Sequence, residues 1–145
     1  MSDFRTLSPT VLASPQISLE DIESAKAAGV TLIVNNRPDG EEPSAPQGDA
    51  IAAAASAAGI GYLAIPIDHT GYGETQVDAM AAALADAEGK VLAYCRSGTR
   101  STFLWSLAQA KVGAAPDDIA TAAQAAGYDI TPVRPLLDLL AAKAN

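Results

Sequence analysis

Residues 91–101 have the sequence VLAYCRSGTRS, and they indicate the fold class more clearly than any other segment. It begins as an apolar run typical of a buried strand, continues as a short polar loop with one glycine, and ends where a helical pattern starts. The stretch predicts a strand over 90–94 and a helix over 101–110. Cys95 therefore stands at the junction of a strand and a helix, in a loop that also holds two arginines.

Helical and strand patterns alternate before this stretch. Three predicted helices are each closed by a glycine, at Gly29, Gly59 and Gly89. Three predicted strands follow them, at 31–34, 62–65 and 90–94. Ser18 and Asp21 have the spacing of a capping box that opens the first helix, and Thr75 is expected to cap the third.

Only helical patterns follow the cysteine loop, at 101–110, 116–126 and 133–140. Strands that alternate with helices predict an α/β fold, with a central, mostly parallel sheet of roughly four to five strands flanked by helices. A length of 145 residues suits a single domain over 1–145. In such folds the ligand site lies at the carboxyl ends of the strands, where Cys95 is expected.

Composition narrows the classes of function. With 9 basic and 17 acidic residues the chain has a formal net charge of −8, which opposes binding to nucleic acid or to an anionic membrane surface. One cysteine and one histidine argue against a disulfide, a metal centre or another bound cofactor. The first residues lack the pattern of a signal peptide, so a reducing, cytoplasmic setting is expected.

The loop after Cys95 has the composition of an anion-binding site. Backbone amides and the start of the following helix can bind a phosphate, and Arg100 can add a planar two-pronged contact. This field favours the thiolate form of Cys95, which is the nucleophilic form. A lone cysteine at the end of a strand is often an inert core residue, but the polar neighbours favour an anion site here. The expected substrate-binding residues of the loop are Arg96, Ser97, Gly98 and Thr99.

The loop resembles the signature of cysteine-dependent phosphatases, in which Cys and Arg bracket the phosphate and Ser or Thr follows the Arg. Arg100 and Ser101 match that ending. Only four residues separate Cys95 from Arg100, one fewer than in the usual phosphatase loop, and Tyr94 stands where a histidine usually precedes the cysteine. The loop equally fits the rhodanese pattern Cys-x-x-Gly-x-Arg.

Four ordered motifs resemble one bacterial family more specifically. They are SPQISLED at 14–21, IVNNRPDGEE at 33–42, IPI at 65–67 and YCRSGTRS at 94–101. Over roughly residues 5–130 the chain resembles the phosphatase-like domain named after the beta-lactamase hydrolase-like protein. This resemblance implies a phosphotyrosine-phosphatase-like fold. A rhodanese would be expected to carry a Gly-His-Ile element, and His69 does not lie in one.

The resemblance also implies a mechanism. Phosphate monoesters, of the protein tyrosine or dual-specificity type, would be hydrolysed through a phosphocysteine on Cys95. Arg100 would stabilise the phosphoryl oxygens, and Ser101 would ease release of the thiolate. An acid on a mobile loop before the cysteine strand would protonate the leaving oxygen. Asp68 is preferred by position; His69 is the alternative acid and is also expected to bind the substrate. The expected partner is a phosphorylated protein or a small-molecule phosphate.

Two other functions remain open on the sequence. Members of the same family fused to sulfur-oxidising enzymes are linked to sulfur transfer, so Cys95 could carry a persulfide as in a rhodanese-like sulfurtransferase. The short loop also suits a non-catalytic phosphate-binding module.

A second polar segment holds Arg37, Asp39, Glu41 and Glu42. We expect it to orient the cysteine loop, with an acidic side chain holding Arg96 or Arg100.

Overall fold

The computed structural model describes residues 2–144. Its strands are β1 (Arg5–Ser8), β2 (Val11–Ser14), β3 (Val30–Asn35), β4 (Gly61–Ala64) and β5 (Lys90–Tyr94). Its helices are α1 (Asp21–Ala27), α2 (Gly48–Ala57), α3 (Glu74–Asp86), α4 (Thr99–Lys111), α5 (Pro116–Ala125), the short 3-10 helix η1 (Thr131–Val133) and α6 (Arg134–Ala144). This element order is that of an α/β fold.

The five strands form one sheet in the order β1-β2-β5-β3-β4. The cysteine strand β5 lies at its centre and runs parallel to both neighbours, β2 and β3. Strand β4 is parallel to β3, whereas β1 pairs antiparallel with β2. The predicted central and mostly parallel sheet is therefore confirmed, and two short strands, β1 and β2, are added at one side.

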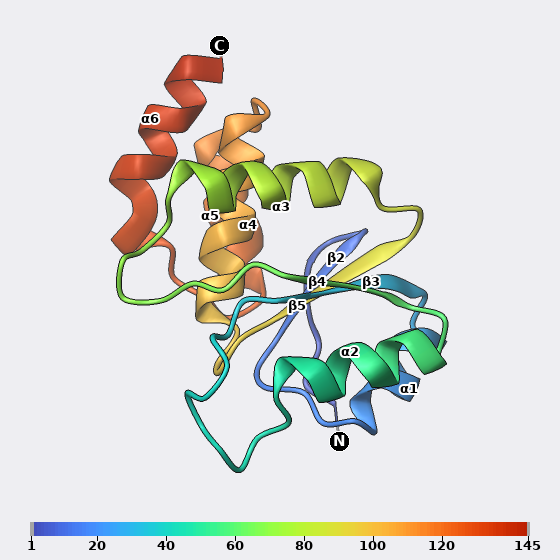
Figure 1. Ribbon diagram of the computed structural model, residues 1–145. Helices are drawn as coiled ribbons and strands as arrows, with labels where there is room; N and C mark the ends of the chain where they lie inside the picture. The colour runs from blue at the N-terminus through green and yellow to red at the C-terminus, as the bar shows by residue number, and fades with distance from the viewer. Residues whose placement is uncertain (1, 145) are drawn as a thin grey trace.

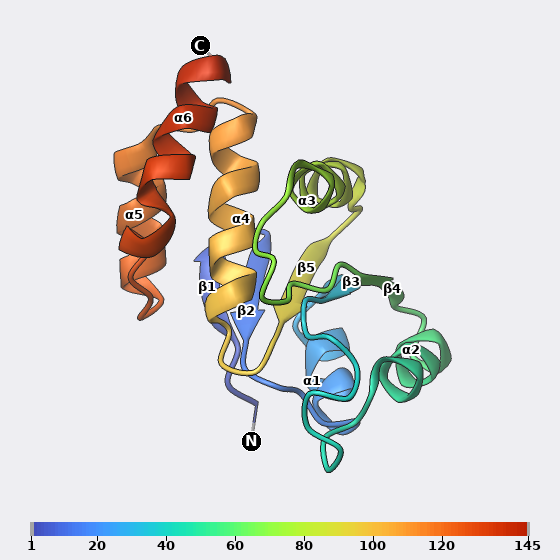
Figure 2. The same ribbon diagram turned by 60° about the vertical axis from the view of Figure 1, so that its left-hand side comes forward.

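Helices cover both faces of the sheet (Figure 1). α1 and α2 lie on one face, and α3 and α4 lie on the other, with α5 and α6 packed outside α4 (Figure 2). The side chains of β5 alternate between the two layers, as a strand requires. Val91 and Ala93 belong to the core under α3 and α4, whereas Leu92 and Tyr94 belong to the core under α1 and α2.

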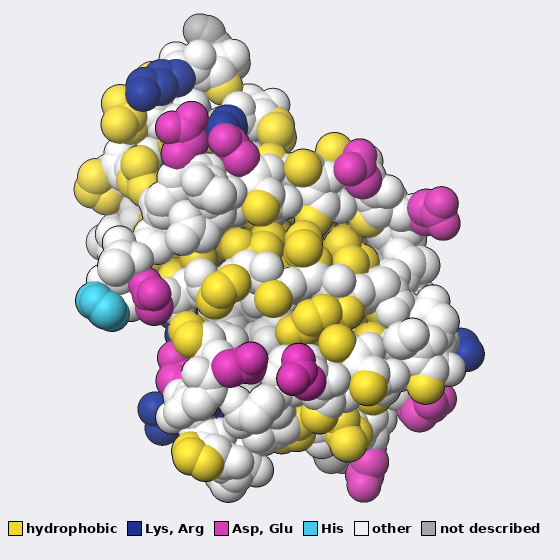
Figure 3. Space-filling view, viewed as in Figure 1, with side chains coloured by type: hydrophobic (Ala, Val, Ile, Leu, Met, Phe, Trp, Pro, Cys, Tyr) yellow, Lys and Arg dark blue, Asp and Glu magenta, His cyan; other side chains and the backbone are white. Residues whose placement is uncertain are grey.

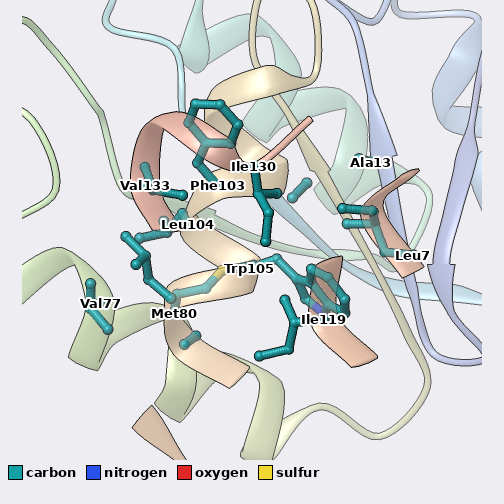
Figure 4. Close-up of a cluster of buried hydrophobic side chains, with 14 of the residues drawn as sticks. Leu7, Ala13, Val77, Met80, Phe103, Leu104, Trp105, Ile119, Ile130 and Val133 are labelled. Carbon is teal, nitrogen blue, oxygen red and sulfur yellow. The ribbon is translucent and has the colours of Figure 1, made fainter. Parts of the chain in front are cut away.

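Helix α4 is the central element of the larger core. Nearly all of its residues from Ser101 to Ala110 are buried, because β-strands, α3, α5 and α6 surround it. Figure 4 shows Phe103, Leu104 and Trp105 of α4 among side chains from these elements. Full burial of a side chain such as Leu104 stabilises the fold by about 1.5–3 kcal/mol. Packing of this kind fixes the start of α4 against the end of β5.

The helix starts test two predictions. The capping box before α1 is present, because the Ser18 amide donates to Asp21 Oδ2 over 2.8 Å and the Asp21 amide donates to Ser18 Oγ over 3.2 Å. The predicted cap of the third helix at Thr75 is wrong. α3 already begins at Glu74 after Gly73, and Thr75 lies inside its first turn, where a hydroxyl cannot serve as the residue that precedes the helix.

Acidic side chains are spread over the face seen in Figure 3 and do not gather in one patch. Within residues 2–144, none of the helices has both the length and the apolar character that crossing a membrane requires.

Candidate active site

Three chain segments meet where the parallel strands end. Asn36 follows β3, residues 65–67 follow β4, and Cys95 follows β5. Backbone hydrogen bonds join the segments beyond the sheet, since the Asn36 amide donates to the Tyr94 carbonyl over 2.8 Å and the Ile67 amide donates to the Asn36 carbonyl over 3.0 Å. The carboxyl edge of the sheet is thus the site that the α/β topology predicts.

The loop from Cys95 to Arg100 connects β5 to α4. Cys95 is fully buried, and the Gly98 amide donates a hydrogen bond to its Sγ over 3.1 Å. Gly98 has a φ of +91°, which other residues rarely adopt, and a Cβ there would collide with the hydroxyl of Tyr128. Glycine at this position therefore lets a backbone N–H reach the sulfur next to the positive end of α4.

Buried hydroxyl groups in the first turn of α4 form hydrogen bonds that hold the start of this helix in place. Ser101 donates from Oγ to Asn36 Oδ1 over 2.8 Å, and Asn36 Nδ2 donates to the Ile65 carbonyl over 2.9 Å. Ser101 and Asn36 are both fully buried. Thr102 donates from Oγ1 to the Gly98 carbonyl over 2.8 Å. Ser101 is thus tied to the ends of β3 and β4, which fixes the helix start relative to all three segments.

Arg100 meets a carboxylate from the segment after β3. Its Nη1 donates to Glu41 Oε2 over 2.9 Å and its Nη2 donates to Glu41 Oε1 over 2.8 Å, a two-pronged ion pair. Nη1 also donates to the Ile67 carbonyl over 2.9 Å. Hydrogen bonds from Arg100 and Arg37 lower the pKa of Glu41 to about 2, and Glu41 in turn raises the pKa of Arg100. An acidic side chain therefore holds Arg100, as the sequence predicts.

A second arginine completes the ion network. Arg37 is buried, and its Nε donates to Glu41 Oε1 over 2.8 Å. Its Nη1 donates to Gln16 Oε1 over 2.9 Å. Glu42 stands 3.6 Å from Arg37 Nη1 as a looser ionic partner. The Glu41 carboxylate is thus shared by two guanidinium groups, of which the buried one anchors it.

The remaining predicted residues lie at the rim or outside this network. Asp39 Oδ1 accepts from the Gly48 amide over 2.8 Å and so anchors the start of α2. The Arg96 side chain is exposed, and the Arg96 carbonyl accepts from the Gln16 amide over 3.2 Å. Ser97 Oγ donates to Thr99 Oγ1 over 2.9 Å at the exposed side of the loop.

The two acid candidates lie on the loop between β4 and α3. Asp68 and His69 are both exposed. Asp68 Oδ1 accepts hydrogen bonds from the Thr70 amide over 2.9 Å and from Thr70 Oγ1 over 2.6 Å, and these bonds lower the pKa of Asp68. In this conformation Asp68 is a carboxylate turned to its own loop. The neighbouring Ile67 carbonyl nevertheless contacts Arg100 directly.

Two tyrosines near the site were missed at the sequence level. Tyr72 packs against Phe103 with ring centroids 6.2 Å apart, and burial together with the charge of Cys95 raises the pKa of Tyr72 to about 12. Tyr128 donates from its hydroxyl to the Ser97 carbonyl over 3.1 Å. The flanking Gly71 and Gly73 marked the first as part of a flexible loop, but nothing local marks Tyr128, which lies beyond α5.

A cysteine loop between a central parallel strand and a buried helix, closed by an arginine, defines a phosphotyrosine-phosphatase-like α/β protein. Solved structures with this fold include human DUSP28, with a TM-score of 0.74 and 19% identity over 99% of this chain and 95% of that one. P. aeruginosa TpbA in complex with pTyr has a TM-score of 0.68 and 17% identity, over 98% of this chain and 90% of that one. At these identities the likeness shows the fold.

The chain belongs to the family of the beta-lactamase hydrolase-like protein, phosphatase-like domain, whose model matches residues 3–112. A "putative phosphatase" from Neisseria meningitidis has a TM-score of 0.84 and 33% identity, over 97% of this chain and 99% of that one. The beta-lactamase hydrolase-like protein of Xylella fastidiosa is 36% identical over 118 residues, which are 81% of this chain and 27% of the relative. The chain thus spans about a quarter of the curated relatives' length. The family resemblance seen in the sequence is confirmed.

Proposed function

We propose that this domain hydrolyses phosphate monoesters, with Cys95 as the nucleophile. The observation that carries the proposal is the position of the Cys95 sulfur, which accepts the Gly98 N–H at the start of α4 in the same loop as Arg100. A phosphoryl group bound there would meet backbone amides, a helix start and a guanidinium group. Candidate substrates are phosphorylated protein side chains, of the tyrosine or dual-specificity type, and small phosphates.

The reaction divides into two displacements at phosphorus. The Cys95 thiolate forms the S–P bond while the P–O bond to the leaving group breaks, and Asp68 gives its proton to the leaving oxygen. Water then attacks phosphorus, the Asp68 carboxylate takes its proton, and the S–P bond breaks to release phosphate and the thiolate. The Ser101 hydroxyl is available to donate to the departing sulfur once it exchanges its bond to Asn36.

Arg100 enters this reaction already oriented. Both terminal nitrogens of Arg100, Nη1 and Nη2, donate to the Glu41 carboxylate, and Nη1 also donates to the Ile67 carbonyl. The positive charge is therefore held at the mouth of the loop, and the phosphoryl oxygens compete with the Glu41 carboxylate for the guanidinium protons. In this proposal Glu41 is a positioning residue that keeps Arg100 beside the cysteine loop before a substrate arrives.

Asp68 must leave Thr70 before it can act as an acid. The two hydrogen bonds from Thr70 lower its pKa and favour the carboxylate, so the proton-donating form requires another loop conformation. Movement toward the substrate removes both bonds and brings the carboxyl next to a negatively charged phosphate, which favours protonation. Gly71, at a φ of +90°, and Gly73 follow Asp68 in the same loop and allow its backbone to turn.

Sulfur transfer is the second candidate function, and the same Asp68 geometry favours it. A Cys95 persulfide forms when the thiolate attacks a sulfane sulfur and displaces sulfite, and no leaving alkoxide needs a proton. A nucleophilic thiolate in either reaction suits a reducing compartment such as the cytoplasm.

One assay on two variants separates these functions. Wild type and Cys95→Ser are compared on an aryl phosphate and on thiosulfate with cyanide. We expect wild type to hydrolyse the phosphate and Cys95→Ser to lose at least about 10³-fold in kcat/KM, because a hydroxyl is a far weaker nucleophile. Turnover of thiosulfate without phosphate hydrolysis would replace the proposal by the second candidate. Binding of inorganic phosphate without turnover of either substrate would leave a binding module.

A further inference from the structure

Tyr128 lies on a segment far from the cysteine loop in sequence, yet its side chain contacts the backbone of that loop. Its hydroxyl donates to the Ser97 carbonyl over 3.1 Å, and the two partners are 31 positions apart along the chain. The Arg5 guanidinium carbon lies over the face of its ring, 5.1 Å from the centroid, a distance at which the cation and the ring attract each other. The phenol is therefore held between the first strand and the cysteine loop.

The bond from Tyr128 fixes the orientation of a single peptide unit. The Ser97 carbonyl and the Gly98 N–H belong to the same peptide group, and this group is trans, since the described residues contain no cis peptide bond. In a trans peptide the C=O and the N–H point in opposite directions. Tyr128 holds the oxygen on one side, and the Gly98 N–H points to Cys95 Sγ over 3.1 Å on the other.

Without the hydroxyl this peptide unit has an easy alternative. Gly98 already adopts a φ of +91°, and glycine turns about its backbone bonds with little steric cost. A rotation of the unit would direct the carbonyl oxygen, a negative group, toward the cysteine sulfur. The phenol oxygen also lies close to Gly98 itself, since a Cβ at this position would collide with it.

We propose that Tyr128 is a positioning residue that holds the Ser97–Gly98 peptide with its N–H toward Cys95 and so stabilises the thiolate and the bound phosphoryl group. Burial raises the pKa of Tyr128 and outweighs the nearby Arg5 guanidinium, which lowers it, so that the phenol keeps the proton that it donates. The role in catalysis rests on the proposed function, but the effect on the sulfur does not.

The test compares Tyr128→Phe with wild type and with Tyr62→Phe. Tyr62 is a matched control because its hydroxyl also has a hydrogen-bond partner, Asn35 at 3.0 Å, but lies in the core on the other face of the sheet. Cys95 is the one cysteine of the chain, so the rate of alkylation by iodoacetamide against pH reports this thiol alone. The Kd for inorganic orthovanadate, a phosphate mimic, is the second measurement.

We expect Tyr128→Phe to move the midpoint of the alkylation profile upward by roughly half to one pH unit and to weaken vanadate binding about 10-fold. Tyr62→Phe should change neither. An unchanged midpoint in Tyr128→Phe, or an equal shift in both variants, would overturn the proposal. These readouts need no turnover, so they remain decisive if the domain proves not to be a phosphatase.

A measurement on wild type covers the case in which Tyr128→Phe does not fold. The amide proton of Gly98, observed by NMR, should shift with pH at the same midpoint as the alkylation profile, because it donates to the ionising sulfur. If the chemical shift of the Gly98 amide proton does not change as the thiol ionises, the geometry on which the proposal depends is contradicted.

Discussion

The cysteine loop and the loop that follows β4 meet at the candidate site, where Arg100 contacts the Ile67 carbonyl, but their hydrogen bonds hold them very differently. The first is fixed by Tyr128 at Ser97, by Thr102 at Gly98 and by Glu41 at Arg100. The second is exposed at Asp68, His69 and Thr70, and within residues 2–144 the Asp68 carboxylate accepts hydrogen bonds from Thr70 of its own loop alone. In the proposed reaction, the backbone of the cysteine loop is held in place before a substrate arrives and Arg100 only exchanges its bonds to Glu41, whereas Asp68 must move with its loop.

This difference separates binding from turnover. Buried hydrogen bonds that need no rearrangement contribute to affinity at once, whereas a group that must reorient contributes only in the conformations that bring it to the substrate. Substitutions in the fixed loop should therefore change the binding of phosphate mimics. Substitutions in the exposed loop should leave that binding intact and slow the chemical step.

The largest expected effect concerns Asp68. Asp68→Asn should lower kcat on alkyl or tyrosyl phosphates by about 10²–10⁴-fold, because a basic leaving oxygen depends on a proton donor. Activated aryl phosphates and the Kd for vanadate should change little. Steady-state kinetics on both substrate types, with His69→Asn as the control, measure the contrast. Full activity of Asp68→Asn on a poor leaving group would transfer the acid role to His69 or to another group.

Arg100 should give the next largest effect. Arg100→Lys keeps the charge but loses the planar fork, and we expect kcat/KM to fall by about 10²–10³-fold, with weaker vanadate binding. Arg96→Lys is the matched control, since that side chain is exposed at the rim and should tolerate the change. Reversed effects of the two substitutions would mean that Arg96 is the residue that binds the phosphoryl group.

Much of the fold, and part of the candidate site, could be predicted from the sequence. The apolar run before Cys95 and the glycine stops predicted the central strand and its helices, because these signals are local. β1 and β2 escaped prediction because no helical pattern closed by a glycine precedes them, and this was the signal that marked the equally short β4. Within the site, Cys95, Arg100 and an acidic partner were expected. Tyr128 was not, because its contact with Ser97 depends on how α5 packs beside β1.

Glu41 should show a smaller effect that depends on pH. Glu41→Gln removes the shared carboxylate, so we expect about a 10-fold loss in kcat/KM from a misplaced Arg100, and a lower Tm at neutral pH. The folded-state pKa of Glu41 is about 2, below the ordinary value of 4.5. Its stabilising contribution is therefore complete above pH 4.5 and is lost as the pH falls toward 2.

Thermal unfolding of wild type and Glu41→Gln across that pH range measures this contribution. The difference in Tm should be largest near neutral pH and shrink below pH 4.5, and it should stay small throughout, because the carboxylate is one-third exposed. Glu42→Gln is the control, since Glu42 is only a loose partner of Arg37. A Tm difference that grows on acidification would contradict the assignment of Glu41 as the stabilising partner of Arg100.

The contacts of Arg100 also determine when the candidate site forms during refolding. Its hydrogen bonds to Glu41 and Ile67 join positions 59 and 33 residues apart in the chain, and both depend on the ends of parallel strands having met. Contacts of such sequence separation form late, because loop closure must precede them. The single tryptophan, Trp105, lies buried on the same helix and reports the packing of its core by fluorescence. During refolding the fluorescence of Trp105 should therefore recover before vanadate binding does. Recovery of vanadate binding would then report the last step of folding.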